Sequence, residues 1–236
     1  MKKPNRYENL EKLLGFAFKN KDLLDLAFVH KSFINEYRDK NESNERLEFL
    51  GDAVLELAVT EYLYKTYPHN PEGVLTNWRS ALVQGKNLAL IANELSLGNY
   101  LYLSRGEEKS GGRKKNYILA NTLEALIGAI YLDHGYKTSH NFISKYILER
   151  LEQILEAGLH IDAKSHFQEL AQEKISMTPE YKFIKEWGPD HAKRFMMAVY
   201  IGDKKVGEGE GSSKQKAEED AARNALARIN WDKLKL

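Results

Sequence analysis

Residues 44 to 58 constrain the fold most, because they predict one helix that is apolar in nearly every direction. At about 100° per residue, Glu45, Glu48 and Asp52 fall on one narrow stripe of that helix. We therefore expect the helix to be largely buried in an all-α domain, with three carboxylates on one face. The other directions are filled mostly by Leu47, Phe49, Leu50, Ala53, Val54, Leu57 and Ala58.

A buried stripe of carboxylates needs a positively charged partner. Like charges one helical turn apart raise each other's pKa, and an unpaired buried charge is costly. Arg46 projects elsewhere on the helix, and an all-carboxylate cluster suits an oxygen-seeking cation such as Mg²⁺. The stripe therefore predicts a metal site. The alternative is that the carboxylates face solvent or pair with basic side chains from elsewhere in the chain.

Composition excludes several classes of protein. The 236 residues carry 35 Lys plus Arg and 34 Asp plus Glu, so a net charge of +1 neither requires nor excludes a polyanionic partner. The chain has no cysteine, which excludes disulfides and thiolate metal sites. No apolar run approaches the roughly 18 residues of a membrane span, and the first residues lack a signal core. We expect a cytoplasmic protein without a membrane partner.

The pattern is helical from Tyr7 to about Leu159, with further helices expected at Thr76 to Leu95, Asn121 to His134 and Ser139 to Glu156. Residues 104 to 115 break this pattern with three glycines and a local net charge of +3. They predict either a loop that brings flexible cations to phosphates or an ordinary solvated loop.

The helix expected from Asn121 contains a second polar set. Asn121 and Glu124 are three residues apart, and Gly128 lies on nearly the same face, where a missing side chain would let another helix come close. The set predicts the second half of the metal site. The alternative is a capping box, in which Asn121 caps the helix and Glu124 supports its first turn.

Beyond a linker at residues 157–161 the pattern changes to α-β-β-β-α over residues 162–231, followed by a short tail at 232–236. Asp162 is expected to cap the first helix. Strands are expected at 181–187, 194–201 and 205–209, and a final helix begins at about Ser213 with an alanine-rich side. The predicted architecture is therefore an all-α domain at residues 1–156 followed by an α+β module.

The final helix of this module places Lys214 and Lys216 in its first turn, where lysine opposes the helix dipole but suits a phosphate. In order and spacing the module resembles a double-stranded RNA-binding domain. Such domains read two minor grooves of an A-form duplex and the phosphates between them. The resemblance implies RNA contacts by Ser165, Gln168, Glu169 and Gln172 on the first helix, by Pro189 and His191 in a loop, and by Lys193, Lys214 and Lys216 on phosphates.

The first domain resembles ribonuclease III. Residues 44–52 match the family's signature nonapeptide, and residues 27–32, 108–112 and 124–128 match three further segments. The resemblance implies a homodimer, formed through this domain, that cuts both strands of an RNA duplex in rRNA and mRNA precursors. It leaves 5′-phosphates, 3′-hydroxyls and short 3′ overhangs, and it uses two Mg²⁺ per site, with Mn²⁺ as a substitute.

The family's site residues carry over to a catalytic set of Glu45, Glu48, Asp52 and Glu124. Within it, Glu48 and Glu124 are metal ligands, Asp52 is a catalytic carboxylate close to the metal, and Glu45 lies at the edge. One position departs from the family, because Asn121 stands where an aspartate is expected. An amide oxygen can still bind Mg²⁺, but the metal set of Glu48, Asp52, Asn121 and Glu124 loses one negative charge.

We therefore expect this chain to bind duplex RNA with weakened metal affinity or slowed cleavage. One rival is a protein that binds double-stranded RNA without cutting it, which Asn121 favours and the remaining carboxylates disfavour. A more distant rival is a metal-dependent nuclease for another nucleic acid, which the second module disfavours.

Overall fold

The computed structural model describes residues 6–37, 42–158, 163–189 and 192–231. The chain divides into two compact units, Met1–His160 and Ile161–Leu236, which are described separately. Asp162, His191 and the tail at 232–236 lie outside the described residues, as does part of the predicted linker. The predicted domain limits stay predictions.

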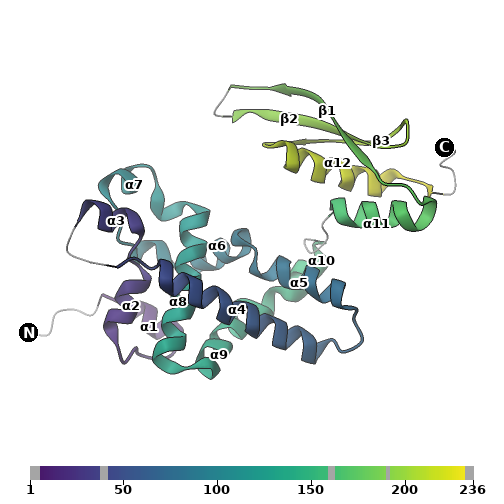
Figure 1. Cartoon of the computed structure of the whole chain (residues 1–236). Coiled ribbons are helices and arrows are strands. Elements are labelled where there is room, and N and C mark those ends of the chain that lie inside the picture. Colours follow the sequence, from purple (N-terminus) through teal and green to yellow (C-terminus); the bar gives the residue numbers. More distant parts are fainter. Residues whose placement is uncertain (1–5, 38–41, 159–162, 190–191, 232–236) are drawn as a thin grey trace, which may run out of the picture. The chain divides into compact units, whose positions relative to one another are not determined.

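The N-terminal unit is built from helices, as the sequence predicts (Figure 1). In the described part of the unit, some of them are joined by the short 3₁₀ turns Leu97–Tyr100, Gly112–Lys114 and Leu148–Arg150. Its core gathers buried side chains from most of the helices, among them Leu24, Leu55, Leu88 and Ile127. The helices are α1 (Glu8–Leu14), α2 (Lys21–Ala27), α3 (Lys31–Glu36), α4 (Glu45–Thr66), α5 (Glu72–Val83), α6 (Gly85–Glu94), α7 (Arg105–Lys109), α8 (Asn116–His134), α9 (Tyr136–Tyr146) and α10 (Leu151–Glu156).

Helices α4 and α8 cross at the centre of this unit and touch backbone to backbone (Figure 1). A Cβ atom on Gly51 would lie 1.7 Å from the carbonyl oxygen of Glu124, and one on Gly128 would lie 2.2 Å from the carbonyl oxygen of Leu47. Only glycine permits so close an approach. The close helix contact predicted at Gly128 is confirmed, and Gly51 is its counterpart on α4.

Several predicted helix limits were wrong. The helix expected from Thr76 to Leu95 is two helices, because Gln84 adopts an extended backbone between α5 and α6. The helix expected from Ser139 to Glu156 is interrupted near Ile147, where the chain tightens into a 3₁₀ turn. Apolar periodicity continues across both breaks because each flanking helix packs on the same core.

The prediction that α4 is largely buried was also wrong. One of its sides packs on α8, but Phe49 is 80% exposed, Leu57 57% and Tyr64 72%. These three side chains form an apolar stripe, because they share one side of the helix, directly beside the acidic stripe. Within the described chain, α4 therefore carries an uncovered apolar surface.

The C-terminal unit has the predicted α-β-β-β-α order. It comprises α11 (Ala163–Ile175), β1 (Glu180–Trp187), β2 (Arg194–Ile201), β3 (Lys204–Gly211) and α12 (Lys214–Arg228), and the antiparallel sheet has the order β1-β2-β3. The predicted alanine side of α12 is buried and packs against β3. Three alternate residues of β3, Gly207, Gly209 and Gly211, lie against α12, and a Cβ on Gly209 would lie 2.0 Å from the backbone nitrogen of Ala221.

Among the described helices none is both long and apolar enough to cross a membrane.

Candidate active site

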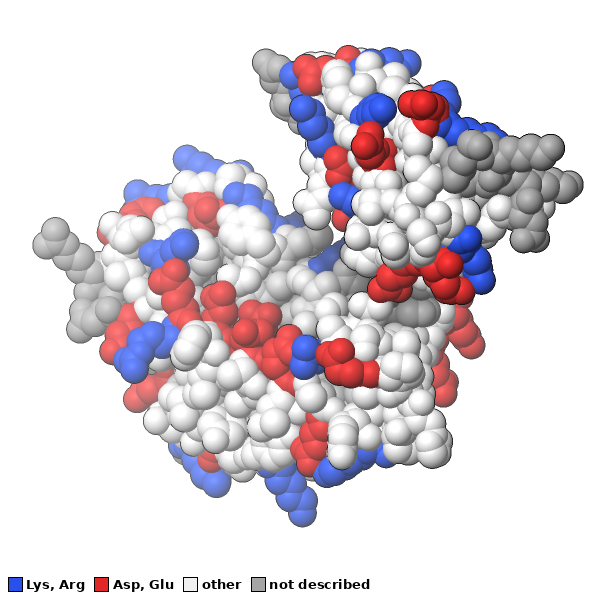
Figure 2. Space-filling model, turned by 45° about the vertical axis from the view of Figure 1, so that its right-hand side comes forward, with Lys and Arg blue, Asp and Glu red and all other residues white. Residues whose placement is uncertain are grey.

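The acidic stripe lies along α4 and begins at its first residue. Glu45 and Asp52 are exposed and Glu48 is half-buried, so the expected burial of the whole stripe was wrong. The stripe continues one turn further to Glu56. The Glu56 carboxylate forms an ion pair with the Arg79 guanidinium on α5, at 3.1 Å. Figure 2 shows acidic side chains gathered in a band across one face of this unit.

Glu124 on α8 joins the stripe because α4 and α8 touch at Gly51. Burial raises the pKa of Glu124 from 4.5 to about 7, and the charges of Asp52 and Glu48 contribute to that rise. These contributions mean that carboxylates from both helices repel one another across the contact. Three of the predicted site residues are therefore brought together.

Asn121 lies one turn before Glu124 on the same helix and contacts Glu48. Burial raises the pKa of Glu48, and a hydrogen bond with the Asn121 side chain opposes that rise. Since a carboxylate has no proton to give, the Asn121 amide N–H is the donor. Helix α8 begins at Asn116 with Lys115 as its N-cap, so the alternative that Asn121 caps the helix was wrong.

Glu45 stands at the edge of the cluster and already has partners. Its carboxylate accepts a hydrogen bond from the Ser43 hydroxyl at 2.9 Å and pairs with the Lys31 ammonium at 3.4 Å. Both contacts lower the pKa of Glu45, the Ser43 bond most strongly. For Glu45, the alternative of pairing with a distant basic side chain is therefore correct. Sequence periodicity did not indicate that Lys31 lies next to the site.

The segments 27–32 and 104–115 lie side by side next to this edge. Val29 and Tyr102 form an isolated parallel bridge, and the backbone N–H of Ser104 donates to the Ser32 hydroxyl at 3.1 Å. The Ser32 hydroxyl also contacts the His30 ring nitrogen Nδ1 at 2.8 Å. Segment 27–32, which matches the family, therefore lies beside the start of segment 104–115, although the two are far apart in sequence.

The prediction of a flexible basic loop at 104–115 was only partly right. The segment folds into α7 and a 3₁₀ turn. The Arg113 guanidinium donates to Glu108 at 2.6 Å and to two backbone carbonyls, and the Lys115 ammonium pairs with Glu107 at 2.6 Å. Lys109 and Lys114 are exposed and remain candidates for phosphate contacts.

The residues present fit a divalent cation by their chemistry. Three carboxylates and one amide provide the oxygen donors that Mg²⁺ prefers. Burial raises the pKa values of Glu48 and Glu124, and neighbouring carboxylates add to the rise, so a cation bound here would offset both effects. In the part of the chain that the structure describes, no three His, Asp or Glu side chains already stand in a ligand arrangement.

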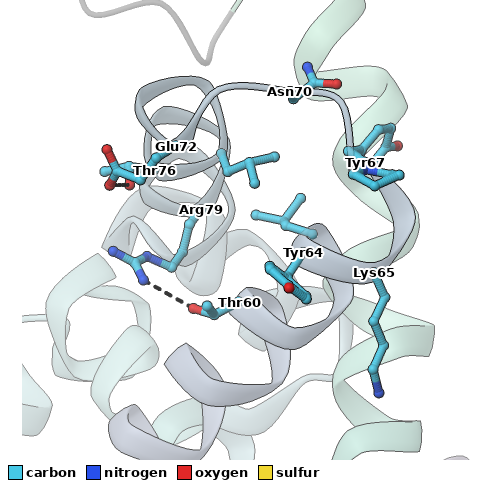
Figure 3. A pocket seen from close by; sticks show the side chains of 11 residues that line it. Thr60, Tyr64, Lys65, Tyr67, Asn70, Glu72, Thr76 and Arg79 are labelled. Carbon is cyan, nitrogen blue, oxygen red and sulfur yellow. Dashed lines mark hydrogen bonds between the residues drawn. The ribbon is translucent and has the colours of Figure 1, made fainter.

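A separate hollow of about 610 Å³ lies between the end of α4 and the start of α5 (Figure 3). Tyr64, Tyr67 and Leu75 are among its lining residues, and Arg79 crosses it to donate to the Thr60 hydroxyl at 3.0 Å. Among the described residues that line it, Glu72 alone carries a carboxylate. The hollow lies along α4 from the acidic cluster and lacks a set of metal donors, so it is not the active site.

Most of the predicted RNA-binding residues of the C-terminal unit are exposed. Ser165, Gln168, Glu169 and Gln172 line one shallow hollow on α11, and Pro189 is exposed beside the strand turn. Lys214 and Lys216 project from the first turn of α12. The remaining predicted contact that can be described, Lys193, pairs with Glu186 at 2.9 Å and is therefore less available than expected.

Comparison with known proteins decides the family. Residues 20–151 match the Ribonuclease-III-like family model, and residues 163–229 match the double-stranded RNA binding motif. The chain is 44% identical over 232 residues to Ribonuclease 3 of Chloroflexus aurantiacus, covering 97% of this chain and 93% of that protein. The chain belongs to the ribonuclease III family. It is an endoribonuclease of the ribonuclease III type, as its sequence motifs imply.

Further similarities agree with this membership. Ribonuclease 3 of Borreliella afzelii is 46% identical over 213 residues, covering 90% of this chain and 87% of that protein. The crystallised nuclease domain of ribonuclease III from Campylobacter jejuni matches with 45% identity and a TM-score of 0.56, covering 63% of this chain and 96% of that one. These findings give no support to the rival interpretation of a binding protein without cleavage activity.

Proposed function

We propose that this ribonuclease III-family chain cleaves double-stranded RNA by metal-dependent hydrolysis at the cluster of Glu48, Asp52, Asn121 and Glu124. The observation that carries the proposal is the glycine contact between α4 and α8, which sets the Glu124 carboxylate among those of α4. The match of residues 163–229 to a double-stranded RNA binding motif supports the choice of substrate.

Each residue of the cluster has a separate task in this proposal. Glu48, Asp52 and Glu124 hold Mg²⁺ through carboxylate oxygens, and the Asn121 amide contributes its oxygen while its N–H keeps Glu48 in place. Glu45, paired with Lys31, stays at the rim. When bound, a divalent cation would supply an activated water and would neutralise charge on the phosphodiester. Glu124 must give up its proton before it can act as a ligand.

Asn121 is expected to slow this enzyme relative to a variant with aspartate at the same position. The cluster carries three formal negative charges where the family's pattern would carry four, and charge count sets much of the affinity for a hard cation. The hydrogen bond to Glu48 is the compensation, because an ionised aspartate could not donate it and would repel Glu48 instead.

The proposed active form is a homodimer joined through the apolar stripe of α4. Phe49, Leu57 and Tyr64 are large, mostly exposed and share one side of the helix, and an apolar patch of this kind marks an interaction surface. A solved nuclease domain of ribonuclease III from Campylobacter jejuni, 46% identical to this chain, has a region described as involved in dimer formation. Because the stripe borders the acidic one, two copies joined here would carry their active sites beside the interface.

The substrate and products can be tested together. End-labelled duplex RNA of about 30 base pairs, the same sequence as single strands, and the matching duplex DNA are incubated with the protein and Mg²⁺. We expect cleavage of the RNA duplex alone, with 5′-phosphate and 3′-hydroxyl ends and short 3′ overhangs. Equal cleavage of single strands or DNA, or products with 3′-phosphates, would refute the proposal.

A further inference from the structure

Phe183 on β1 is a large aromatic side chain that remains 46% exposed in the folded C-terminal unit. It pairs with Met197 on β2, and Tyr181 pairs with Val199, which belongs to the core beneath the helices. Residues two apart on a strand share a face, so Phe183 lies on the helix side of the sheet. Its partly uncovered ring therefore faces the layer that contains α12.

The ammonium of Lys214 lies over this ring, 5.1 Å from its centroid. Lys214 is the first residue of α12, and its backbone is fixed because the Ser213 hydroxyl accepts the N–H of Lys216 at 3.2 Å. The helix start is also held against β3, where a Cβ on Gly211 would lie 2.5 Å from the backbone nitrogen of Ala217. The position of the Lys214 backbone is thus set by packing, and the aromatic ring sets the position of its charge.

This pairing offsets an unfavourable placement. A lysine in the first turn of a helix is repelled by the positive end of the helix dipole. The negative face of an aromatic ring attracts an ammonium within about 6 Å, and the methylene stem of lysine covers apolar surface. The ring engages one side of the ammonium, whose three N–H donors leave others for an anion.

We propose that Phe183 is a positioning residue that holds the Lys214 ammonium ready for an RNA phosphate. The inference rests on the proposed function, in which Lys214 contacts the duplex backbone. Phe183 acts through Lys214: the ring limits the freedom of a flexible side chain before RNA arrives, so less of that freedom is lost on binding.

A second aromatic pair in the same sheet provides a matched control. The ammonium of Lys182 lies 4.8 Å from the ring centroid of Tyr200. Lys182 is the neighbour of Phe183 on β1 and so points to the opposite face of the sheet. Neither Lys182 nor Tyr200 belongs to the predicted RNA contacts, so breaking this pair should not affect RNA binding.

The test measures binding of a fluorescent RNA duplex of about 30 base pairs to the full chain in EDTA, by anisotropy at several salt concentrations. The variants are Phe183→Leu, Phe183→Tyr, Lys214→Gln, the double variant Phe183→Leu/Lys214→Gln, and Tyr200→Leu as the control. Thermal melting of each variant reports whether it folds.

We expect Phe183→Leu to weaken binding about two- to fivefold, while Phe183→Tyr and Tyr200→Leu bind like the unchanged chain. Lys214→Gln should weaken binding and reduce the slope of log affinity against log salt by about one. In the Lys214→Gln background, Phe183→Leu should not weaken binding further, because the ammonium that Phe183 positions is absent.

The outcomes separate this inference from the proposed function. If Phe183→Leu costs as much in the Lys214→Gln background as alone, or if Phe183→Tyr is as weak as Phe183→Leu, Phe183 does not act through Lys214. If Lys214→Gln weakens binding but Phe183→Leu does not, only the positioning role fails. If Lys214→Gln itself leaves affinity and salt slope unchanged, the proposed RNA contact of Lys214 fails and the positioning role fails with it.

Discussion

Replacing Gly128 with alanine should push α8 away from α4 and disable the proposed active site. The new Cβ would lie 2.2 Å from the carbonyl oxygen of Leu47 and 3.1 Å from the backbone nitrogen of Gly51, both of which belong to α4. Neither is the end of a flexible side chain, so the helices must separate by roughly 1 Å to restore an ordinary contact distance. That movement displaces Glu124 from the carboxylates of α4.

The cost of this change can be estimated. Overpacking a well-packed core typically costs about 1–3 kcal/mol of folding free energy, so Gly128→Ala should lower stability by that amount and still fold. A misplacement of about 1 Å in a catalytic constellation can cost about a hundredfold in rate. We therefore expect a loss of cleavage much larger than the loss of folded protein.

Matched variants make this measurement decisive. A Cβ on Gly73 of α5 would meet no other atom within 4 Å, so Gly73→Ala should leave cleavage unchanged and stability equal or about 1 kcal/mol higher. Gly51→Ala, with a contact of 1.7 Å, should be more severe than Gly128→Ala. Cleavage of duplex RNA is followed beside urea unfolding and RNA binding. Full activity in a folded Gly128→Ala protein would show that the α4–α8 contact does not set the site.

Three further predictions concern charge and assembly. Asn121→Asp should tighten the apparent affinity for Mg²⁺ about ten- to a hundredfold, measured as a shift in the Mg²⁺ dependence of cleavage. Equal Mg²⁺ titration curves for this variant and the unchanged chain would contradict the role given to Asn121. In EDTA the protein should lose stability as pH rises from about 4.5 to 7 and then level off, because Glu124 keeps its proton in the folded state up to a pKa of about 7 but releases it near 4.5 when unfolded. Melting curves of Glu124→Gln should lack this part of the pH dependence. Phe49→Asp should shift sedimentation from dimer to monomer by placing a charge in the apolar stripe, and an unchanged dimer would place the interface elsewhere.

Much of the fold follows from local sequence pattern. The helical first unit, the change to α-β-β-β-α near residue 160 and the alanine face of α12 each rest on periodicity, which the structure preserves. The close approach at Gly128 was predictable because a glycine on the polar face of a helix leaves room for a neighbour. Helix breaks at Gln84 and Ile147 were not predictable, because the apolar pattern runs across them.

The candidate site was predictable in its acidic residues but not in its surroundings. Periodicity places Glu48 and Asp52 on one stripe, whereas the contact of Lys31 with Glu45 depends on how two helices meet. Pattern alone also cannot tell an apolar face that is buried in the core from one that is exposed on the surface. That is why the exposure of Phe49 and Leu57 was missed, and why the acidic stripe was expected to be buried.

The most direct test of the proposed chemistry compares cleavage and binding of one duplex RNA by the unchanged chain and by Glu124→Gln. Both proteins are titrated with Mg²⁺, cleavage rates are measured at each concentration, and RNA affinity is measured in EDTA. The account predicts cleavage by the unchanged chain that requires Mg²⁺, and its loss in Glu124→Gln with RNA affinity retained. Cleavage by Glu124→Gln at the rate of the unchanged chain, or cleavage that persists without any divalent cation, would contradict it.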